Sequence, residues 1–198
     1  MKAHDSRKGK NAWHALIPAI GTDGDVYPFI GLGAELSKRG YRVTIATHEH
    51  FAAYAKAAGL DFVSLISNTE TDALVRQKDF WHPLKGPIVI SRWHAKLVPR
   101  QYNVLLKLAS EKKTFIVANP GVVVGRIIQE QLKTRLFSVV LQPWLIPSFV
   151  EPPVMMGGLT LPRWAPKSAR KLYIRLFDKI GVTGRFKRDP LGSKWGPF

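Results

Sequence analysis

The sequence predicts an α/β fold in which a doubly wound parallel sheet forms the core. Two observations lead to this prediction. Apolar, β-branched runs alternate with helix-like segments between Ala12 and Ile66, and the connections between them are short. Short strand–helix–strand connections force neighbouring strands to pair in parallel through right-handed crossovers. Ligands are then expected beyond the carboxyl ends of the strands.

The first strand is expected at Ala12–Ile20, where the residues are mostly apolar. A helix should follow over Pro28–Arg39, with Pro28 in its first turn and Gly40 as a left-handed cap. The β-branched run Tyr41–Thr47 predicts the second strand. His14 lies inside the first strand, and we interpret it as a core histidine.

The rest of the sheet is expected to continue the alternation, with a helix over Phe51–Ala58 that Gly59 closes. The remaining elements are predicted as a strand at Asp61–Ile66, helices at Thr69–Phe80 and Ala95–Lys112 around an irregular Trp81–Trp93, a strand at Thr114–Ala118, a helix at Val122–Lys133 and a strand at Arg135–Leu141.

The character of the chain changes after Gln142. Residues 143–166 are too rich in proline for a helix or a central strand and too apolar for a solvated linker. Residues 167–180 predict a basic helix. The expected organisation is a basic extension (1–11), one Rossmann-like domain (12–180; core 12–142, proline-rich segment 143–166, basic helix 167–180) and a flexible tail (181–198).

Composition narrows the class of protein. The chain has 198 residues, 45% of them hydrophobic, which supports a sizeable core, and it has no cysteine. Disulfide frameworks, thiolate metal sites and cysteine nucleophiles are thereby excluded. The start resembles no signal peptide, and no apolar run reaches the roughly 20 residues of a membrane span. We expect a cytoplasmic protein, with a peripheral contact at the inner face of the membrane left open.

The charge is large and uneven. The formal net charge is +16, and from Leu161 to Phe198 ten lysine and arginine residues face two aspartates, a net of +8. Such clustering attracts polyanions, such as an anionic membrane. A solubilising surface is the plainer alternative. Nucleic acid is disfavoured as a partner, because the chain carries no recognised binding motif.

The loop Gly21–Pro28 is the most informative motif. Its two glycines permit a tight turn and a close backbone approach to a ligand, and the following helix directs its positive end there. It is not a Walker loop, which requires Gly-Lys-Ser/Thr. It is also a poor dinucleotide fingerprint, because its glycines stand three apart and Gly31 and Gly33 fall inside the helix.

The stretch from Gly21 to Leu65 resembles the first segment of GT-B glycosyltransferases that glycosylate lipids, sterols and antibiotics. The type is family 28 and the UDP-glycosyltransferases, including rhamnosyltransferases and sterol glucosyltransferases. The segments that carry the resemblance are Gly21, Thr22, Gly24, Asp25, Pro28 and Leu32, then Arg39-Gly40-Tyr41-Arg42-Val43 and Ala58-Gly59-Leu60-Asp61-Phe62. The chain departs from the pattern at Asp23 and Tyr41. Asn119-Pro120 and Gln142-Pro143 resemble the family more loosely.

The resemblance implies that Asp25 is the general base that takes a proton from the acceptor hydroxyl in an inverting transfer. The residues themselves also allow a helix N-cap at Asp25, and one side chain can serve both purposes. Acceptor binding is expected from Gly24, from His48 and His50 after the second strand, and from Trp144, Phe149 and Met155. The last three could instead pack under a long loop.

The expected function is the acceptor-binding half of an inverting glycosyltransferase that moves a hexose to a lipid-like or apolar acceptor. The nucleoside-diphosphate sugar is a co-substrate of the full enzyme, and neither a cofactor nor a metal ion is expected in this domain. Because nothing after Gln142 resembles the donor domain, we expect no activity without a donor-binding partner subunit. The alternative is a non-enzymatic basic module that binds an anionic membrane or another polyanion.

Overall fold

The computed structural model describes residues 13–83, 85–119, 121–142, 161–162 and 164–180, with the side chains of 176–180 left aside. Within these residues the chain forms two compact units. The described residues up to Gln77 and those of Leu97–Val139 belong to the first, and those of Lys78–Lys96 and from Val140 onward belong to the second. The sheet lies in the first unit.

The elements alternate between strand and helix, as expected of an α/β chain. In order they are β1 (His14–Pro18), α1 (Asp23–Lys38), β2 (Arg42–His48), the short 3-10 helix η1 (Glu49–Phe51), α2 (Ala52–Ala57), β3 (Asp61–Ile66), α3 (Asn68–Val75), α4 (Gly86–Ala109), β4 (Thr114–Ala118), α5 (Val123–Leu132), β5 (Arg135–Ser138) and α6 (Lys167–Ile180).

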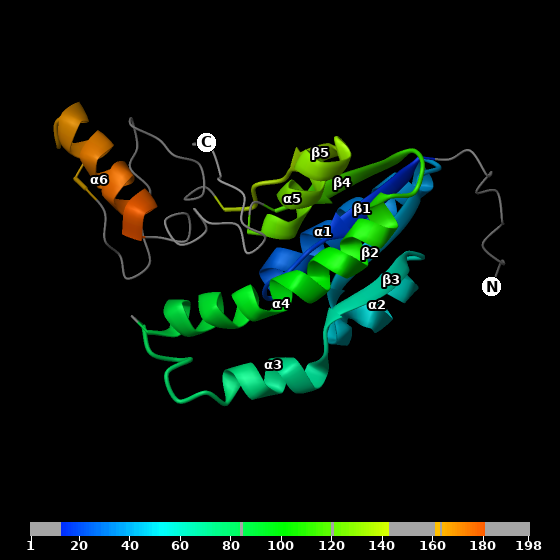
Figure 1. Ribbon diagram of the computed structural model, residues 1–198, viewed down its shortest axis with the longest axis horizontal. Helices are drawn as coiled ribbons and strands as arrows, with labels where there is room; N and C mark the ends of the chain where they lie inside the picture. The colour runs from blue at the N-terminus through cyan, green and yellow to red at the C-terminus, as the bar shows by residue number, and fades with distance from the viewer. Residues whose placement is uncertain (1–12, 84, 120, 143–160, 163, 181–198) are drawn as a thin grey trace. The chain divides into compact units, whose positions relative to one another are not determined.

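The sheet has five strands in the order β3-β2-β1-β4-β5, and every pair is parallel. In Figure 1, β5 and α5 lie beside β4, while β3 and α2 lie at the opposite edge of the sheet. The strand order reverses between β1 and β4, which is the topological switch point of a doubly wound sheet. The predicted Rossmann-like fold class is confirmed.

Helices α1 and α5 cover opposite faces of this sheet. A methyl group added to Gly33 of α1 would lie 3.3 Å from Val43 and 3.4 Å from Ile17, whose side chains share one face. A methyl group on Gly125 of α5 would lie 3.6 Å from Ile116, which points to the other face. Glycine at these positions lets each helix approach the sheet closely.

His14 is buried in β1, with 1% of its surface exposed. Its Nε2 lies 2.9 Å from the Thr44 hydroxyl and its Nδ1 lies 3.2 Å from the Thr114 hydroxyl. Burial, together with the nearby charge of Arg42, lowers the pKa of His14 to about 4. The prediction of a core histidine is confirmed.

Helix α1 begins five residues before the predicted start. Thr22 is its N-cap, Asp23 is its first residue, and Pro28 lies inside the helix instead of in its first turn. The acidic pair Asp23 and Asp25 occupies the first turn, where carboxylates favour the positive end of the helix. These residues extend the helix toward β1 despite Gly24. The predicted left-handed cap at Gly40 is confirmed, with φ of 88°.

Two boundaries in the middle of the chain also differ from the prediction. Helix α3 ends at Val75 instead of Phe80, and α4 begins at Gly86, inside the stretch expected to be irregular. Pro87 stands in the first turn of α4, where a missing amide hydrogen costs nothing. Glycine and proline therefore mark the start of this helix, not a loop.

β5 is an edge strand and is shorter than predicted, ending at Ser138. Phe137 keeps 53% of its surface exposed. Its ring meets Phe115 of β4 edge to face, with centroids 5.6 Å apart.

In the second unit, α6 spans Lys167–Ile180 and buries Ile174. No helix among the described residues is both long and apolar enough to cross a bilayer. Most of the proline-rich segment, residues 143–160, lies outside the described part of the chain.

Candidate functional site

The candidate site lies at the carboxyl edge of the sheet, at the switch point between β1 and β4. The loop after β1 leads through Gly21 and Thr22 into α1, and the loop after β4 leads through Asn119 into α5. Loops that leave neighbouring strands in opposite directions open a crevice in such sheets, and ligands bind there.

Asp25 occupies the third position of α1 and is partly exposed. Its Oδ2 accepts hydrogen bonds from the backbone N–H of Thr22 at 2.9 Å and from the Thr22 hydroxyl at 3.1 Å. This is the reciprocal bond of a capping box, so the N-cap is Thr22 and not Asp25. The two bonds hold the carboxylate in one orientation at the mouth of the helix.

Gly21 is required for that orientation. Its φ of 145° lies in a region that favours glycine. A Cβ atom built at this position would lie 2.3 Å from Asp25 Oδ2 and 2.6 Å from Asp25 Cβ, closer than real contacts allow. The backbone of Gly21 therefore occupies the space directly against the Asp25 side chain.

Gly24 faces open space. It is exposed, and a Cβ atom added to it would meet nothing within 4 Å. Pro28, four residues on, has no amide hydrogen to give to the Gly24 carbonyl. The backbone next to Asp25 is therefore exposed, and the acceptor-binding role expected for Gly24 stays a prediction.

His48 is the last residue of β2, the strand next to β1, and His50 lies in η1 directly after it, so both lie at the same edge of the sheet as Asp25. His48 is buried, and its Nδ1 lies 3.4 Å from the Thr71 hydroxyl of α3. His50 is exposed and stacks on Phe51, with ring centroids 3.9 Å apart. Of the two histidines, His50 is the one that presents its ring to solvent.

The β2–β3 part of this edge is held by a hydrogen-bond network. Glu49 accepts a hydrogen bond from the backbone N–H of Asn68 at 2.9 Å, and Glu70 accepts one from the backbone N–H of Ser67 at 2.9 Å. Arg100 of α4 binds Glu70 through both terminal nitrogens, at 2.7 and 2.9 Å, which is the main reason that the pKa of Glu70 falls to about 2. These carboxylates therefore have structural partners.

The acidic and histidine side chains described at this edge do not form a cluster of metal ligands. The carboxylate of Glu49, between the two histidines, accepts a hydrogen bond from the backbone N–H of Asn68, the first residue of α3. Among the residues that the structure describes, no three histidine, aspartate or glutamate side chains gather closely enough to hold one.

Tyr27 connects α1 to the segment after β2. Its ring meets Phe51 and Tyr54 edge to face, with centroids 5.4 and 5.3 Å away. The hydrogen bond with Tyr54 raises the pKa of Tyr27 to about 12, so its phenol stays neutral near neutral pH. Tyr27 supports the loop and is no candidate for the base.

The sequence analysis assigned no role to three polar residues here. Thr22 could have been found from the spacing Thr22-x-x-Asp25, which is typical of a capping box. The side-chain oxygens of Thr47 and Asn119 are buried and find no hydrogen-bond partner within the described ranges. Both residues lie at the carboxyl ends of strands. The family resemblance had marked Asn119 without giving it a role, whereas nothing in the sequence pattern marked Thr47.

The other expected acceptor residues, Trp144, Phe149 and Met155, lie outside the described residues. The structure therefore shows only the part of the expected acceptor site that the sheet carries.

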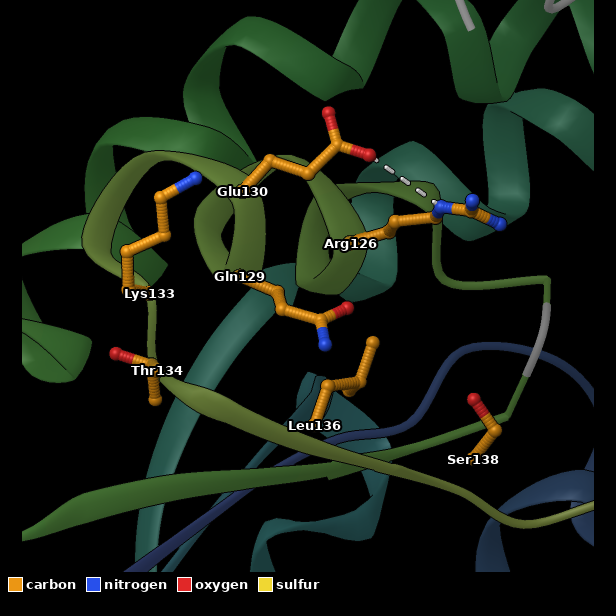
Figure 2. A pocket seen from close by; sticks show the side chains of 7 residues that line it. All are labelled: Arg126, Gln129, Glu130, Lys133, Thr134, Leu136 and Ser138. Carbon is orange, nitrogen blue, oxygen red and sulfur yellow. Dashed lines mark ion pairs between the residues drawn. The ribbon is translucent and has the colours of Figure 1, made fainter. Parts of the chain in front are cut away.

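Two hollows lined by described residues lie away from Asp25. The first, of about 480 Å³, lies between α5 and β5. In Figure 2 its wall is formed by α5, where Arg126 and Glu130 make an ion pair of 3.5 Å, and by Leu136 and Ser138 of β5. The second, of about 460 Å³, opens near Trp13 and Thr114 at the amino edge of the sheet. Neither includes the switch point, so we place the site by topology and by Asp25.

Residues 15–149 match the Glycosyltransferase family 28 N-terminal domain. Relatives match this chain at low identity. A sterol 3-beta-glucosyltransferase of Arabidopsis thaliana, UGT80A2, is 30% identical over 135 residues, covering 63% of this chain and 21% of that protein. A sterol 3-beta-glucosyltransferase of Pichia angusta is 29% identical over 155 residues, covering 74% of this chain and 12% of that protein. The chain thus spans a small part of each relative's length.

Solved structures share the fold. The glycotransferase of kitacinnamycin superposes with a TM-score of 0.57 and 16% identity, over 91% of this chain and 37% of that one. The glycosyltransferase SnogD from Streptomyces nogalater gives a TM-score of 0.51 and 20% identity, over 67% of this chain and 36% of that one.

Proposed function

The chain belongs to the glycosyltransferase family 28 N-terminal domains, and from this premise we propose that it is the acceptor-binding half of an inverting glycosyltransferase. The acceptor is a lipid-like or apolar alcohol. The sugar is a hexose that comes from a nucleoside-diphosphate donor. This domain binds no cofactor of its own, and the donor is held by a separate donor-binding half.

The single observation that carries this proposal is the construction of the loop around Asp25. Thr22 holds the carboxylate with two hydrogen bonds, and Gly21 leaves room for it. Next to it, Gly24 is exposed and faces open space. A carboxylate that is fixed in orientation but reachable by a ligand is what general-base catalysis requires.

The proposed reaction is a displacement at the anomeric carbon. Asp25 takes the proton of the acceptor hydroxyl while the hydroxyl oxygen forms a bond to that carbon. The bond from the carbon to the diphosphate breaks on the opposite side, so the configuration inverts and the nucleoside diphosphate leaves. A positioned base of this kind contributes about 10²–10⁴-fold in rate.

Sterol is the acceptor class that we test first. Two relatives are named as sterol 3-beta-glucosyltransferases, and they match 74% and 63% of this chain. A sterol offers one hydroxyl on a rigid apolar body. His50 and the exposed backbone at Gly24 are the described groups that could contact it.

The test combines this chain with the part of the Arabidopsis relative that it does not match. Transfer of glucose from UDP-glucose to a sterol should require both polypeptides. Sterol binding by this chain alone, followed by fluorescence quenching of its tryptophans, should not depend on the second polypeptide.

Absence of both binding and transfer would contradict the acceptor-binding role. Binding without transfer would leave the acceptor role standing and would reject this donor half as a working partner. The alternative of a non-enzymatic basic module predicts that neither sterol nor UDP-glucose affects the chain, whereas anionic vesicles do.

A further inference from the structure

Helix α6 turns a row of cations outward. Lys167, Lys171 and Arg175 recur every fourth residue and so lie along one side of the helix, and all three are exposed. Tyr173 lies across the helix from this row and is partly buried, whereas Ile174, seven residues after Lys167, borders the row and is buried. Burial therefore settles which side of the described part of α6 faces the solvent.

Two apolar side chains stand beside this row. Leu172 has 57% of its surface exposed, and Trp164, just before the helix, has 85% exposed. Tryptophan favours the boundary between lipid headgroups and acyl chains, and lysine stems can lie along apolar surface while the charge stays in water. A cationic row with an adjacent leucine and tryptophan is typical of a helix that lies on a membrane.

We infer that this face of α6 docks on an anionic membrane surface. The cationic row would meet the lipid phosphates, and Leu172 and Trp164 would enter the headgroup region. Charge complementarity supports this partner, because all five charged residues in the range 161–175 are basic. A nucleic acid could use the same cations, but it would gain nothing from an exposed leucine.

This inference goes beyond the proposed function, since a membrane contact needs no sugar transfer. If the proposed function is also correct, the contact would bring the acceptor-binding half to the place where a lipid-like acceptor resides. The two claims can fail separately, because vesicle binding is measured without donor or acceptor.

The experiment uses vesicles of phosphatidylcholine with or without phosphatidylserine, and measures the fraction of chain that sediments with them. Binding should require the anionic lipid and should weaken as salt is added. Replacing all three cations of the row (Lys167→Glu, Lys171→Glu and Arg175→Glu) should weaken binding by roughly a hundredfold, at about fivefold for each cation.

A matched control carries the same change of charge on exposed lysines of the first unit: Lys38→Glu, Lys56→Glu and Lys107→Glu. This variant should keep most of the vesicle binding. If this variant loses as much vesicle binding as the α6 variant, the attraction comes from the net charge of the chain, and the proposal that α6 is the docking surface is wrong.

Leu172→Gln separates a membrane from other polyanions without changing the charge. It should weaken vesicle binding severalfold and leave binding to a duplex DNA probe unchanged. Unchanged vesicle binding by Leu172→Gln would overturn the proposal, as would a lack of binding to the anionic vesicles by the unmodified chain. Thermal melting of each variant shows that a loss of binding is not a loss of folding.

Discussion

Replacing Gly21 with alanine tests the structural basis of the Asp25 site. The φ of 145° at this position is strained for an alanine, which costs about 1–3 kcal/mol. The new methyl group would also lie 2.3 Å from Asp25 Oδ2, so the carboxylate must leave Thr22. Loss of that capping interaction costs about 1 kcal/mol more. We expect Gly21→Ala to lower the free energy of unfolding by about 2–4 kcal/mol.

Urea unfolding followed by tryptophan fluorescence measures this difference. Gly24→Ala is the control in the same loop, because a methyl group there would meet nothing within 4 Å and Gly24 lies within α1. Alanine should stabilise the helix by about 0.5–1 kcal/mol relative to glycine. Equal stability of Gly21→Ala and the unmodified chain, or equal losses in both variants, would refute the described loop geometry.

Three further predictions concern stability. The pKa of His14 is about 4 in the folded chain and 6.5 in the unfolded chain, so the unfolded chain binds the proton first as the pH falls. Up to about 3 kcal/mol of the free energy of unfolding should be lost between pH 6.5 and 4. In His14→Gln the free energy of unfolding should change less over that range. The pKa of Glu70 is lowered to about 2, so its contribution to the free energy of unfolding should be lost as the pH falls from 4.5 to 2. Glu70→Gln weakens the pair with Arg100 and should lower the free energy of unfolding by about 1 kcal/mol at pH 7, measured by urea unfolding. Gly33→Ala should lower the free energy of unfolding by about 1–3 kcal/mol, because its methyl group would lie 2.9 Å from the Leu60 side chain. Gly125→Ala, with contacts of 3.6 Å or more, should be neutral or stabilising. Equal melting temperatures of the two variants would contradict the packing of α1 on the sheet.

The order of strands and helices could be predicted because strand and helix periodicities differ along this chain. His14 illustrates the limit of that reasoning. Its position in an apolar strand predicted burial, but its partners, Thr44 and Thr114, are far away in sequence and come together only in the sheet. The low pKa of His14 follows from those neighbours and could not be derived from the strand alone.

The predicted start of a helix was wrong where a proline and a capping box indicated different starts. Pro28 favours the first turn of a helix, yet the capping pair Thr22 and Asp25 starts α1 five residues earlier. The same spacing at Ser67 and Glu70 starts α3. Both pairs are visible in the sequence, so the capping-box pattern would have given the correct starts.

The candidate site could be predicted only in part. The motif and its resemblance identified Asp25, but the role of Gly21 depends on a φ value and a contact that sequence does not contain. His48 and His50 have the same residue type and adjoining positions. Only the structure shows that one is buried against Thr71 and the other is exposed.

The most direct test of the central claim is the rate of sugar transfer by Asp25→Asn, measured with the complementing donor half and compared with Asp23→Asn. Both aspartates lie in the first turn of α1, so the control removes one charge at nearly the same place. A general base at Asp25 predicts a fall in kcat of about 10²–10⁴-fold with sterol binding unchanged, and little effect at Asp23. Transfer by Asp25→Asn at the rate of the unmodified chain would contradict the assignment of the base.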